Sequence, residues 1–415
     1  MATKIITHPM GFLLCMGLSL AAFQQAEAQL SCSNLFSSEI KIVNILSDIG
    51  AGGQNVSQVE LNSSGDRALT YASSGNSFAG PRSLLIDLST GKNLIEELGV
   101  TFRGSFNRAG DLVLISQQIP SQSYALSKWQ VLVLDASTGK VKYSLSPDIA
   151  TSMFSKNGNL ILSSPLSSSS QTEMQNTVSV NDAQTGIKLA TFTRPLRQAK
   201  AIAASPDNRH VVVINAQQMW SNSSEGILFS IHDIKSGRTI IEESSPVYSA
   251  VYDPSGKYLL TGIRSKSIPG ENAFQLRNGR TGEVIRTFGY GFGGAQLSFT
   301  KNGKQIIALG GTQVALFDLK TLAPTASIKT DTFFRSATAS ANGDLVIVST
   351  PRKSDRETRA VDNFFVYEFA TGKVVYQELG QAMSEVFGAT TNDGSFYGII
   401  PTDYRNTSVK ILKFN

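Results

Sequence analysis

The sequence predicts an all-β protein, an eight-bladed β-propeller of four-stranded antiparallel blades, closed by the N-terminal strand completing the last blade. Three observations lead to this prediction. A tight turn recurs eight times along the chain, a second kind of turn follows seven of these, and no stretch shows a convincing helical period. One four-stranded sheet cannot bury both of its faces, whereas a ring of such sheets can.

The first recurring unit is a turn between two apolar runs. Gly or Asn supplies the positive φ that such a turn needs, and Asp and Ser hydrogen-bond the local backbone. The apolar runs beside the turns, for example 112–115 and 211–214, are rich in β-branched residues and therefore predict strands. The turns lie at 64–66, 109–111, 157–159, 207–209, 255–257, 302–304, 342–344 and 393–395.

The second unit is another hairpin turn, which follows the first by about 26 residues. A repeat of about 47 residues then holds four strands, here called a to d from the centre outward, which is the length of one propeller blade. The sequence thus predicts tight a–b and c–d turns in every repeat. The second turn lies at 86–92, 134–140, 181–187, 232–238, 277–283, 317–323 and 367–373.

The two ends of the propeller region complement each other. After Gly394 the chain has two more strands, Phe396–Ile400 and Val409–Phe414, so the last repeat lacks its d strand. Residues 38–46 form an alternating strand without a repeat of its own, and we expect it to supply the missing strand. Closure removes a sheet edge that would invite aggregation. The alternative is a seven-bladed ring with a divergent extra repeat, and the eight turns favour eight blades.

Residues 1–28 have the pattern of a secretory signal peptide. Lys4 precedes an apolar stretch over 10–23, and Ala26-Glu27-Ala28 matches a cleavage site. The stretch is shorter than the roughly 20 residues of a membrane span, although an uncleaved anchor is the alternative. No later segment predicts a transmembrane span. We therefore expect one domain over 29–415, located in the periplasm or secreted.

Cysteine usage agrees with an exported bacterial protein. Cys32 is the only cysteine after position 28, so no internal disulfide can form. A periplasmic location suits this composition better than a disulfide-dense extracellular one. The alternative is a lipoprotein in which Cys32 is the modified N-terminal residue. Gln29 fits poorly with the signal that precedes such a cysteine.

The repeats resemble those of bacterial WD40-like and YVTN-type β-propellers. In that family the first turn of each repeat reads Ser-Pro-Asp-Gly, and residues 205–208 and 253–256 resemble it. The resemblance implies the propeller fold over nearly all of positions 29–415, but no activity, because this fold hosts many functions. The Trp of a strict WD dipeptide is replaced in each repeat, which favours a bacterial relative. The second turn is matched at Asp87, Asp135, Asp182, Asp233 and Asp318, and the Trp position holds Ile86, Leu134, Asn181, His232, Arg277, Phe317 and Tyr367.

Residues for catalysis or metal binding are sparse. His210 and His232 are the only histidines after position 28, and two isolated histidines do not make a metal site. Residues 289–294 match a dinucleotide-binding glycine pattern but have no helix behind them, so we interpret them as a connection between blades. The a strands contain many small residues, as in 199–204 and 336–340, which suits a crowded centre. The sequence therefore predicts no cofactor and no metal.

The b–c loops vary in length while the tight turns are uniform. A face formed by variable loops commonly carries recognition, although neutral loop drift gives the same pattern. Large apolar and basic residues are expected on the face that the b–c loops share with the d–a connections, including Phe292 and Phe334. We predict partner binding there by Arg194, Arg197, Met219, Trp220, Tyr290, Phe333, Arg335, Arg352 and Arg356.

These features predict an exported, non-catalytic binding platform that engages a protein or an anionic envelope component through its loop face. The net charge of +5 is too modest to suggest nucleic acid for an exported chain. One alternative is a quinone- or metal-dependent enzyme with a site in the central channel, although Trp129 and Trp220 are too few for the docking repeats of quinoproteins. The other is a propeller resembling an outer-membrane assembly factor.

Overall fold

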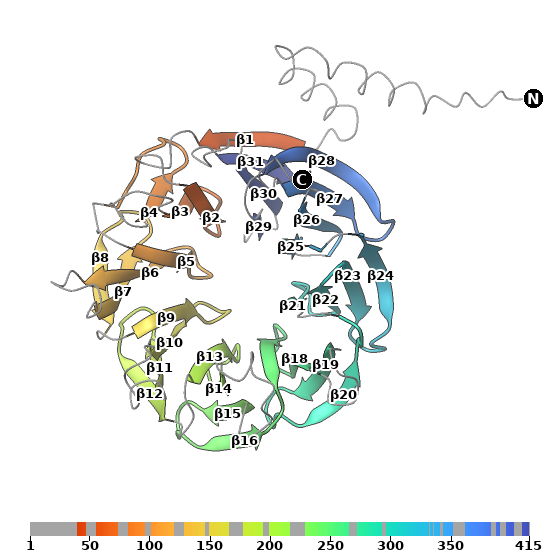
Figure 1. The fold of residues 1–415 in the computed structure, drawn as a ribbon. Coiled ribbons are helices and arrows are strands. Elements are labelled where there is room, and N and C mark those ends of the chain that lie inside the picture. Colours follow the sequence, from red (N-terminus) through yellow and green to blue (C-terminus); the bar gives the residue numbers. More distant parts are fainter. Residues whose placement is uncertain are drawn as a thin grey trace, which may run out of the picture.

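Antiparallel sheets surround a central channel in the computed structural model of the chain (Figure 1). Each sheet runs from an inner to an outer strand, and successive sheets follow one another around the ring. The structure describes residues 40–46, 55–73, 82–95, 101–119, 128–145, 149–165, 177–193, 199–215, 229–264, 272–292, 296–331, 333–334, 336–340, 343–351, 362–382, 387–390, 396–401 and 409–414.

The strands of the first half are short and follow the predicted turns. The first sheet along the chain has β2 (Asn55–Leu61), β3 (Arg67–Ser73) and β4 (Arg82–Asp87). Next come β5 (Thr101–Phe106), β6 (Leu112–Ile119), β7 (Lys128–Asp135) and β8 (Val141–Leu145). They are followed by β9 (Ile149–Phe154), β10 (Leu160–Pro165), β11 (Thr177–Asp182) and β12 (Lys188–Thr193), and then by β13 (Ala199–Ala204), β14 (His210–Asn215), β15 (Phe229–Asp233) and β16 (Thr239–Glu243).

The second half repeats this order. One blade has β17 (Val247–Tyr252), β18 (Tyr258–Arg264), β19 (Asn272–Asn278) and β20 (Val284–Phe288). The next has β21 (Gln296–Phe299), β22 (Gln305–Gly310), β23 (Gln313–Asp318) and β24 (Pro324–Lys329), and then β25 (Ser336–Ala339), β26 (Leu345–Pro351), β27 (Asp362–Glu368) and β28 (Lys373–Ala382). The last has β29 (Phe387–Thr390), β30 (Phe396–Pro401) and β31 (Val409–Phe414), joined by β1 (Ile40–Leu46).

The prediction of eight four-stranded blades is wrong. The described residues form seven four-stranded blades, not eight, and the sheet β2-β3-β4 has three strands. The extra repeat at the start of the ring is therefore divergent. Its first turn has the expected sequence, and the difference lies at its outer edge.

Among the described residues no outer strand pairs with β4, and Asn93 occupies part of this edge. After the turn that ends β4, the chain makes one isolated bridge between Ile86 and Asn93. The Asn93 side-chain oxygen then accepts hydrogen bonds from the N–H groups of Leu85 and Ile95, at 3.3 and 3.2 Å. Its amide nitrogen donates to the carbonyl of Ile95 at 2.9 Å. A side chain thus satisfies backbone groups that an outer strand would otherwise pair.

The two ends of the ring meet in one sheet. β1 pairs antiparallel with β31, from Ile40 opposite Phe414 to Leu46 opposite Val409. The resulting sheet has the order β1-β31-β30-β29, so the strand earliest in the sequence is the outer strand of the final blade. In Figure 1, β1 and β31 lie side by side where the N-terminal and C-terminal colours meet.

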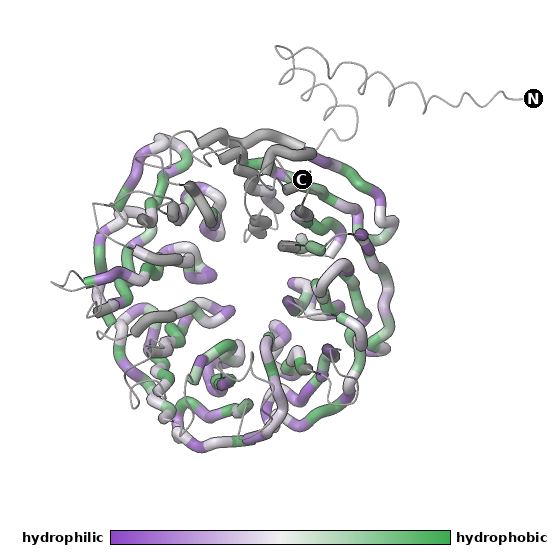
Figure 2. Tube along the Cα trace, viewed as in Figure 1, coloured by the Kyte–Doolittle hydropathy of each residue, from purple (hydrophilic) through white to green (hydrophobic). Residues whose placement is uncertain are grey.

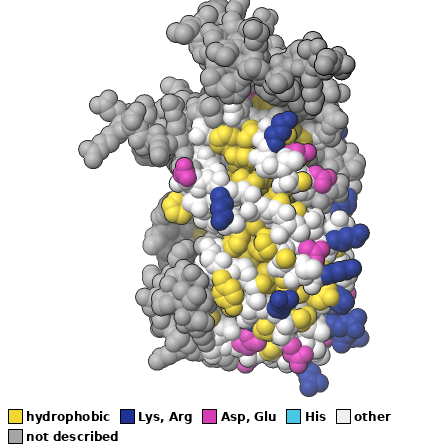
Figure 3. All heavy atoms as spheres, turned by 90° about the vertical axis from the view of Figure 1, so that its right-hand side faces the viewer, with side chains coloured by type: hydrophobic (Ala, Val, Ile, Leu, Met, Phe, Trp, Pro, Cys, Tyr) yellow, Lys and Arg dark blue, Asp and Glu magenta, His cyan; other side chains and the backbone are white. Residues whose placement is uncertain are grey.

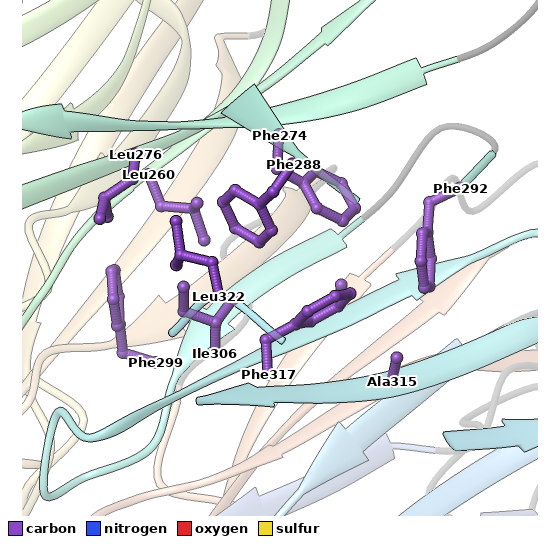
Figure 4. Close-up of a cluster of buried hydrophobic side chains, with 11 residues drawn as sticks. Leu260, Phe274, Leu276, Phe288, Phe292, Phe299, Ile306, Ala315, Phe317 and Leu322 are labelled. Carbon is purple, nitrogen blue, oxygen red and sulfur yellow. The ribbon is translucent and has the colours of Figure 1, made fainter. Parts of the chain in front are cut away.

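The buried core lies between neighbouring sheets. Hydrophobic residues recur along the strands and alternate with hydrophilic ones (Figure 2), as expected for sheets packed face to face. Between β17–β20 and β21–β24, for example, Phe274, Phe288, Phe292 and Phe317 gather in one cluster (Figure 4). Phe317 contacts Phe288 with ring centroids 5.4 Å apart, so aromatic packing joins these two blades.

The position that replaces the Trp of the WD dipeptide is structural. Each of these c-strand residues is buried, whatever its chemical type. Several contact the outer strand of the preceding blade: His232 stacks on Phe192 at 4.6 Å, and Phe317 contacts Phe288. The variation at this position therefore reflects pairwise packing between blades. The residues are Ile86, Leu134, Asn181, His232, Arg277, Phe317 and Tyr367.

Candidate functional site

Two of the predicted partner-binding residues lie in the described part of the chain. Tyr290 is 57% exposed and Phe333 is 70% exposed, which places both at the surface. They belong to the d–a connections before and after the β21–β24 blade. The other seven predicted residues lie outside the described residues: Arg194, Arg197, Met219, Trp220, Arg335, Arg352 and Arg356.

The connection that carries Tyr290 is held in place by its neighbours. Gly289 has a φ of +64°, and a Cβ there would lie 2.4 Å from the Phe274 ring, so the position requires glycine. The N–H of Gly291 donates to the carbonyl of Asn272 at 3.2 Å. Phe292 is buried, 5.3 Å from the Phe274 ring centroid. Tyr290 is thus presented to solvent by a backbone fixed on both sides.

The second connection repeats this arrangement. The N–H of Phe334 donates to the carbonyl of Gly311 at 2.9 Å, and that of Thr330 to Thr312 at 3.0 Å. Phe334 is buried between the β21–β24 and β25–β28 blades. Its neighbour Phe333 is left exposed.

The four aromatic residues that the sequence predicts on one face therefore differ in exposure. Phe292 and Phe334 belong to the core, and expecting them on the binding face is wrong. Tyr290 and Phe333 remain on that face and are called the aromatic pair below. The b–c loop between their connections is short, because β22 ends at Gly310 and β23 begins at Gln313. An exposed aromatic residue on a fixed backbone is a typical anchor for a protein partner.

His210 and His232 are both buried. His210 is 4% exposed and opens β14, and burial lowers the pKa of its imidazole. The ring nitrogens of His232 lie 3.0 and 3.1 Å from the hydroxyls of Ser230 and Thr239. Within the described residues, no group of three His, Cys, Asp or Glu side chains could hold a metal ion, and no helix is long and apolar enough to cross a membrane.

A cavity of about 750 Å³ occupies the channel where the a strands enter the a–b turns. Its walls are largely apolar and come from several blades. Phe154, Leu297 and Ala337 belong to three different a strands. Cavities of this size can hold a small organic molecule.

The a–b turns pack against one another around this end of the channel. Each turn begins with a small polar residue that fixes its backbone. The Asn107 side-chain oxygen, for example, accepts hydrogen bonds from the N–H groups of Gly110 and Leu112, both at 3.0 Å. The glycine of the next turn leaves no room for a side chain, because a Cβ on Gly158 would lie 2.7 Å from the Arg108 nitrogen. The second residue of each turn is therefore held at the rim.

Three of these second residues are basic. Arg108, Lys156 and Lys301 line the cavity, whereas the equivalent positions 63, 206 and 254 hold Ser or Pro. Lys156 is exposed as a whole residue, but desolvation at the channel and, second, the charge of Arg108 lower its pKa, while the charge of Asp253 raises it. We call Arg108, Lys156 and Lys301 the basic rim.

Glu60 carries the only carboxylate among the described residues that line the cavity. Burial raises its pKa to about 7, and the N–H of Phe106 donates to it at 3.2 Å. The two convergent carboxylates of a hydrolytic site are therefore not present among these lining residues.

The sequence prediction missed the basic rim. A glycine or asparagine marks each a–b turn in the sequence, and the residue two positions before it is basic in three of the turns. Aligning the turns would have placed Arg108, Lys156 and Lys301 in one column. Glu60 had no comparable signal, because a single acidic residue in a strand usually faces solvent.

Comparisons with known proteins identify the fold alone. No family model matches the chain, and no curated protein matches it. The C-terminal WD40 domain of Sif2 is similar, with a TM-score of 0.57 and 12% identity, over 92% of this chain and 99% of that domain. A eukaryotic initiation factor has a TM-score of 0.53 and 11% identity, over 78% of each chain.

A third solved structure, the β-propeller domain of Myceliophteria thermophila Cps50 (Swd1), has a TM-score of 0.48 and 15% identity, over 76% of this chain and 98% of that domain. The likeness to the Sif2 domain shows that the protein has a WD40-type β-propeller fold. These identities show neither a bacterial origin nor the YVTN type.

Proposed function

We propose that this protein is an exported, non-catalytic binding platform whose loop face engages a protein partner. The observation that carries the proposal is the aromatic pair, Tyr290 and Phe333, presented at 57% and 70% exposure on connections that the core holds in place. Fixing an anchor before binding reduces the conformational entropy that association costs. WD40-type propellers commonly act as protein-interaction scaffolds, which supports the same reading.

The sequence adds predicted positive charges to the loop face. Five arginines predicted for the same face would steer an acidic partner surface or an anionic envelope component towards the aromatic pair. The signal-like pattern of residues 1–28 supports export to the periplasm or beyond. The arginines are Arg194, Arg197, Arg335, Arg352 and Arg356.

Site-specific photo-crosslinking tests the proposal. A photoreactive amino acid at position 333 should crosslink one protein of the native host, identified by mass spectrometry, and Tyr290→Ser should reduce its yield about tenfold or more. The matched control is a crosslinker at position 285, because Ile285 is 54% exposed on the outer strand β20. Equal yields of the same protein from positions 333 and 285 would contradict the proposed face.

A further inference from the structure

The basic rim lies at the opposite end of the channel from the aromatic pair. In antiparallel blades the a–b and c–d turns share one end of the ring, and the b–c loops and d–a connections share the other. The cavity is lined by the a–b turns, whereas the aromatic pair lies on d–a connections. A ligand at the basic rim would therefore not compete directly with a partner on the loop face.

The charge of the cavity is strongly unbalanced. Arg108, Lys156 and Lys301 supply three cations, and Glu60 supplies the single carboxylate among the described lining residues. Because the pKa of Glu60 is about 7, that carboxylate is only partly ionised at neutral pH. Desolvation is the largest cause of the lowered pKa of Lys156, and the charge of Arg108 comes second. A bound anion beside this ammonium would favour its charged form.

The packing of the turns fixes the backbone of the basic rim, whose three residues are exposed. The Asn157 side-chain nitrogen donates to the carbonyl of Pro206 at 2.7 Å and to Asn208 at 2.6 Å, which joins the turn of Lys156 to the next blade. A Cβ on Gly303 would lie 3.4 Å from the Pro254 ring, so the turn of Lys301 lies against the preceding blade. Turns held together in this way keep the three basic residues at one end of the channel, so binding a small ligand requires little ordering of the backbone.

We propose that the channel cavity is a binding site for a small organic polyanion. Its phosphate or carboxylate groups would lie between Arg108, Lys156 and Lys301, and its carbon skeleton would pack on the apolar wall formed by Phe154 and Leu297. Arg108 can bind such a group through two parallel hydrogen bonds, while the lysines act as point charges. The volume of about 750 Å³ exceeds what a single inorganic anion needs.

Calorimetric titration of the whole protein with inorganic triphosphate and, separately, with citrate tests this inference. At least one of the two probes should bind with one-to-one stoichiometry, and the preferred probe identifies the anionic group. Lys156→Ala and Arg108→Ala should each weaken binding about tenfold, as expected for losing one nearby charge.

Lys301→Ala and Lys304→Ala form a matched pair, because both lysines lie in one turn and Lys304 does not line the cavity. Lys301→Ala should weaken binding several-fold, and Lys304→Ala should leave it within twofold. Far-ultraviolet circular dichroism checks that each variant folds. Equal effects of the two substitutions would show general charge attraction and overturn the proposal. Binding of an acidic peptide with no binding of either small probe would overturn it as well.

Discussion

At the scale of single residues, Glu60 is a carboxyl group whose environment favours its neutral form. It lies on the inner strand β2 and faces the channel cavity. Burial raises its pKa to about 7, so the fold favours the neutral acid. Above the pKa of the unfolded chain, near 4.5, the unfolded state gains stability by ionising while the folded state holds the proton.

Glu60→Gln should therefore change the pH dependence of stability. The wild-type protein should lose about 1–3 kcal/mol of unfolding free energy as the pH rises from about 4.5 to about 7 because of this group. Gln keeps an oxygen to accept the Phe106 N–H and has no charge to bury, so the variant should be more stable by that amount at pH 8 and equal at pH 4. Urea unfolding at both pH values measures the difference, and a variant less stable at pH 8 would contradict the expectation.

At the scale of neighbouring elements, Arg277 joins two blades. It lies on β19 and is fully buried, and it binds both carboxylate oxygens of Glu243 on β16, at 2.9 and 2.8 Å. Its guanidinium also donates to the Gly282 carbonyl at 3.0 Å and lies 4.7 Å from the Phe229 ring centroid. A buried charge with this many partners is stable only while they remain.

Removing one partner of the pair should be costly. Arg277→Ala should lower the unfolding free energy by about 3–5 kcal/mol, because Glu243 loses its cation and a large buried side chain leaves a cavity. The double variant Arg277→Met with Glu243→Met should cost less than Arg277→Ala alone. Arg280→Ala, at an exposed position in the following turn, should change stability by less than about 0.5 kcal/mol. Equal costs for Arg277→Ala and Arg280→Ala in urea unfolding would refute this role.

The outer wall of the ring is formed by strands that are only partly buried. In Figure 3, hydrophobic side chains spread over the wall, while Lys and Arg gather along one edge. Several outer strands expose aliphatic residues near their starts, including Val141, Leu189, Ile240 and Val284. The outer strands are only partly buried, so the cohesion of the ring comes from contacts between blades.

At the scale of the whole molecule, the pairing of β1 with β31 closes the ring. Without β1, the final blade would end at β31 and present an unpaired edge. A chain lacking residues 40–46 should therefore melt about 5–10 °C lower and aggregate more readily. Adding a synthetic peptide of residues 40–46 should restore part of the melting temperature, and a scrambled peptide should not. Differential scanning calorimetry measures both, and an unchanged melting temperature after deletion would contradict the closing role.

The sequence predicted the repeats well because turns have strong local signals. Gly65, Gly110 and Gly158 have positive φ values, as the turn chemistry requires. The irregular edge that the described residues form beside β4 was not predictable from such signals, because it depends on the hydrogen bonds of the Asn93 side chain. Hydrogen bonds between a side chain and a distant backbone group leave no periodic pattern in the sequence.

The candidate sites were predictable only in part, for a related reason. Composition alone cannot tell which of two adjacent aromatic residues faces the core. Phe334 is buried and Phe333 is exposed because the Phe334 N–H donates a hydrogen bond to the Gly311 carbonyl. The basic rim depends on which residues of distant repeats meet around one channel. That convergence is a property of the closed ring, and no single repeat contains it.

Asn93 has a consequence for how copies of this protein meet. A sheet edge with free N–H and C=O groups can recruit a strand from another molecule and grow sideways. Beside β4, both backbone groups of Leu85 are already occupied, its N–H by the Asn93 side chain and its carbonyl by the N–H of Leu94 at 2.7 Å. Within the described residues, the backbone of Leu85 therefore offers no free donor or acceptor to a strand from another molecule.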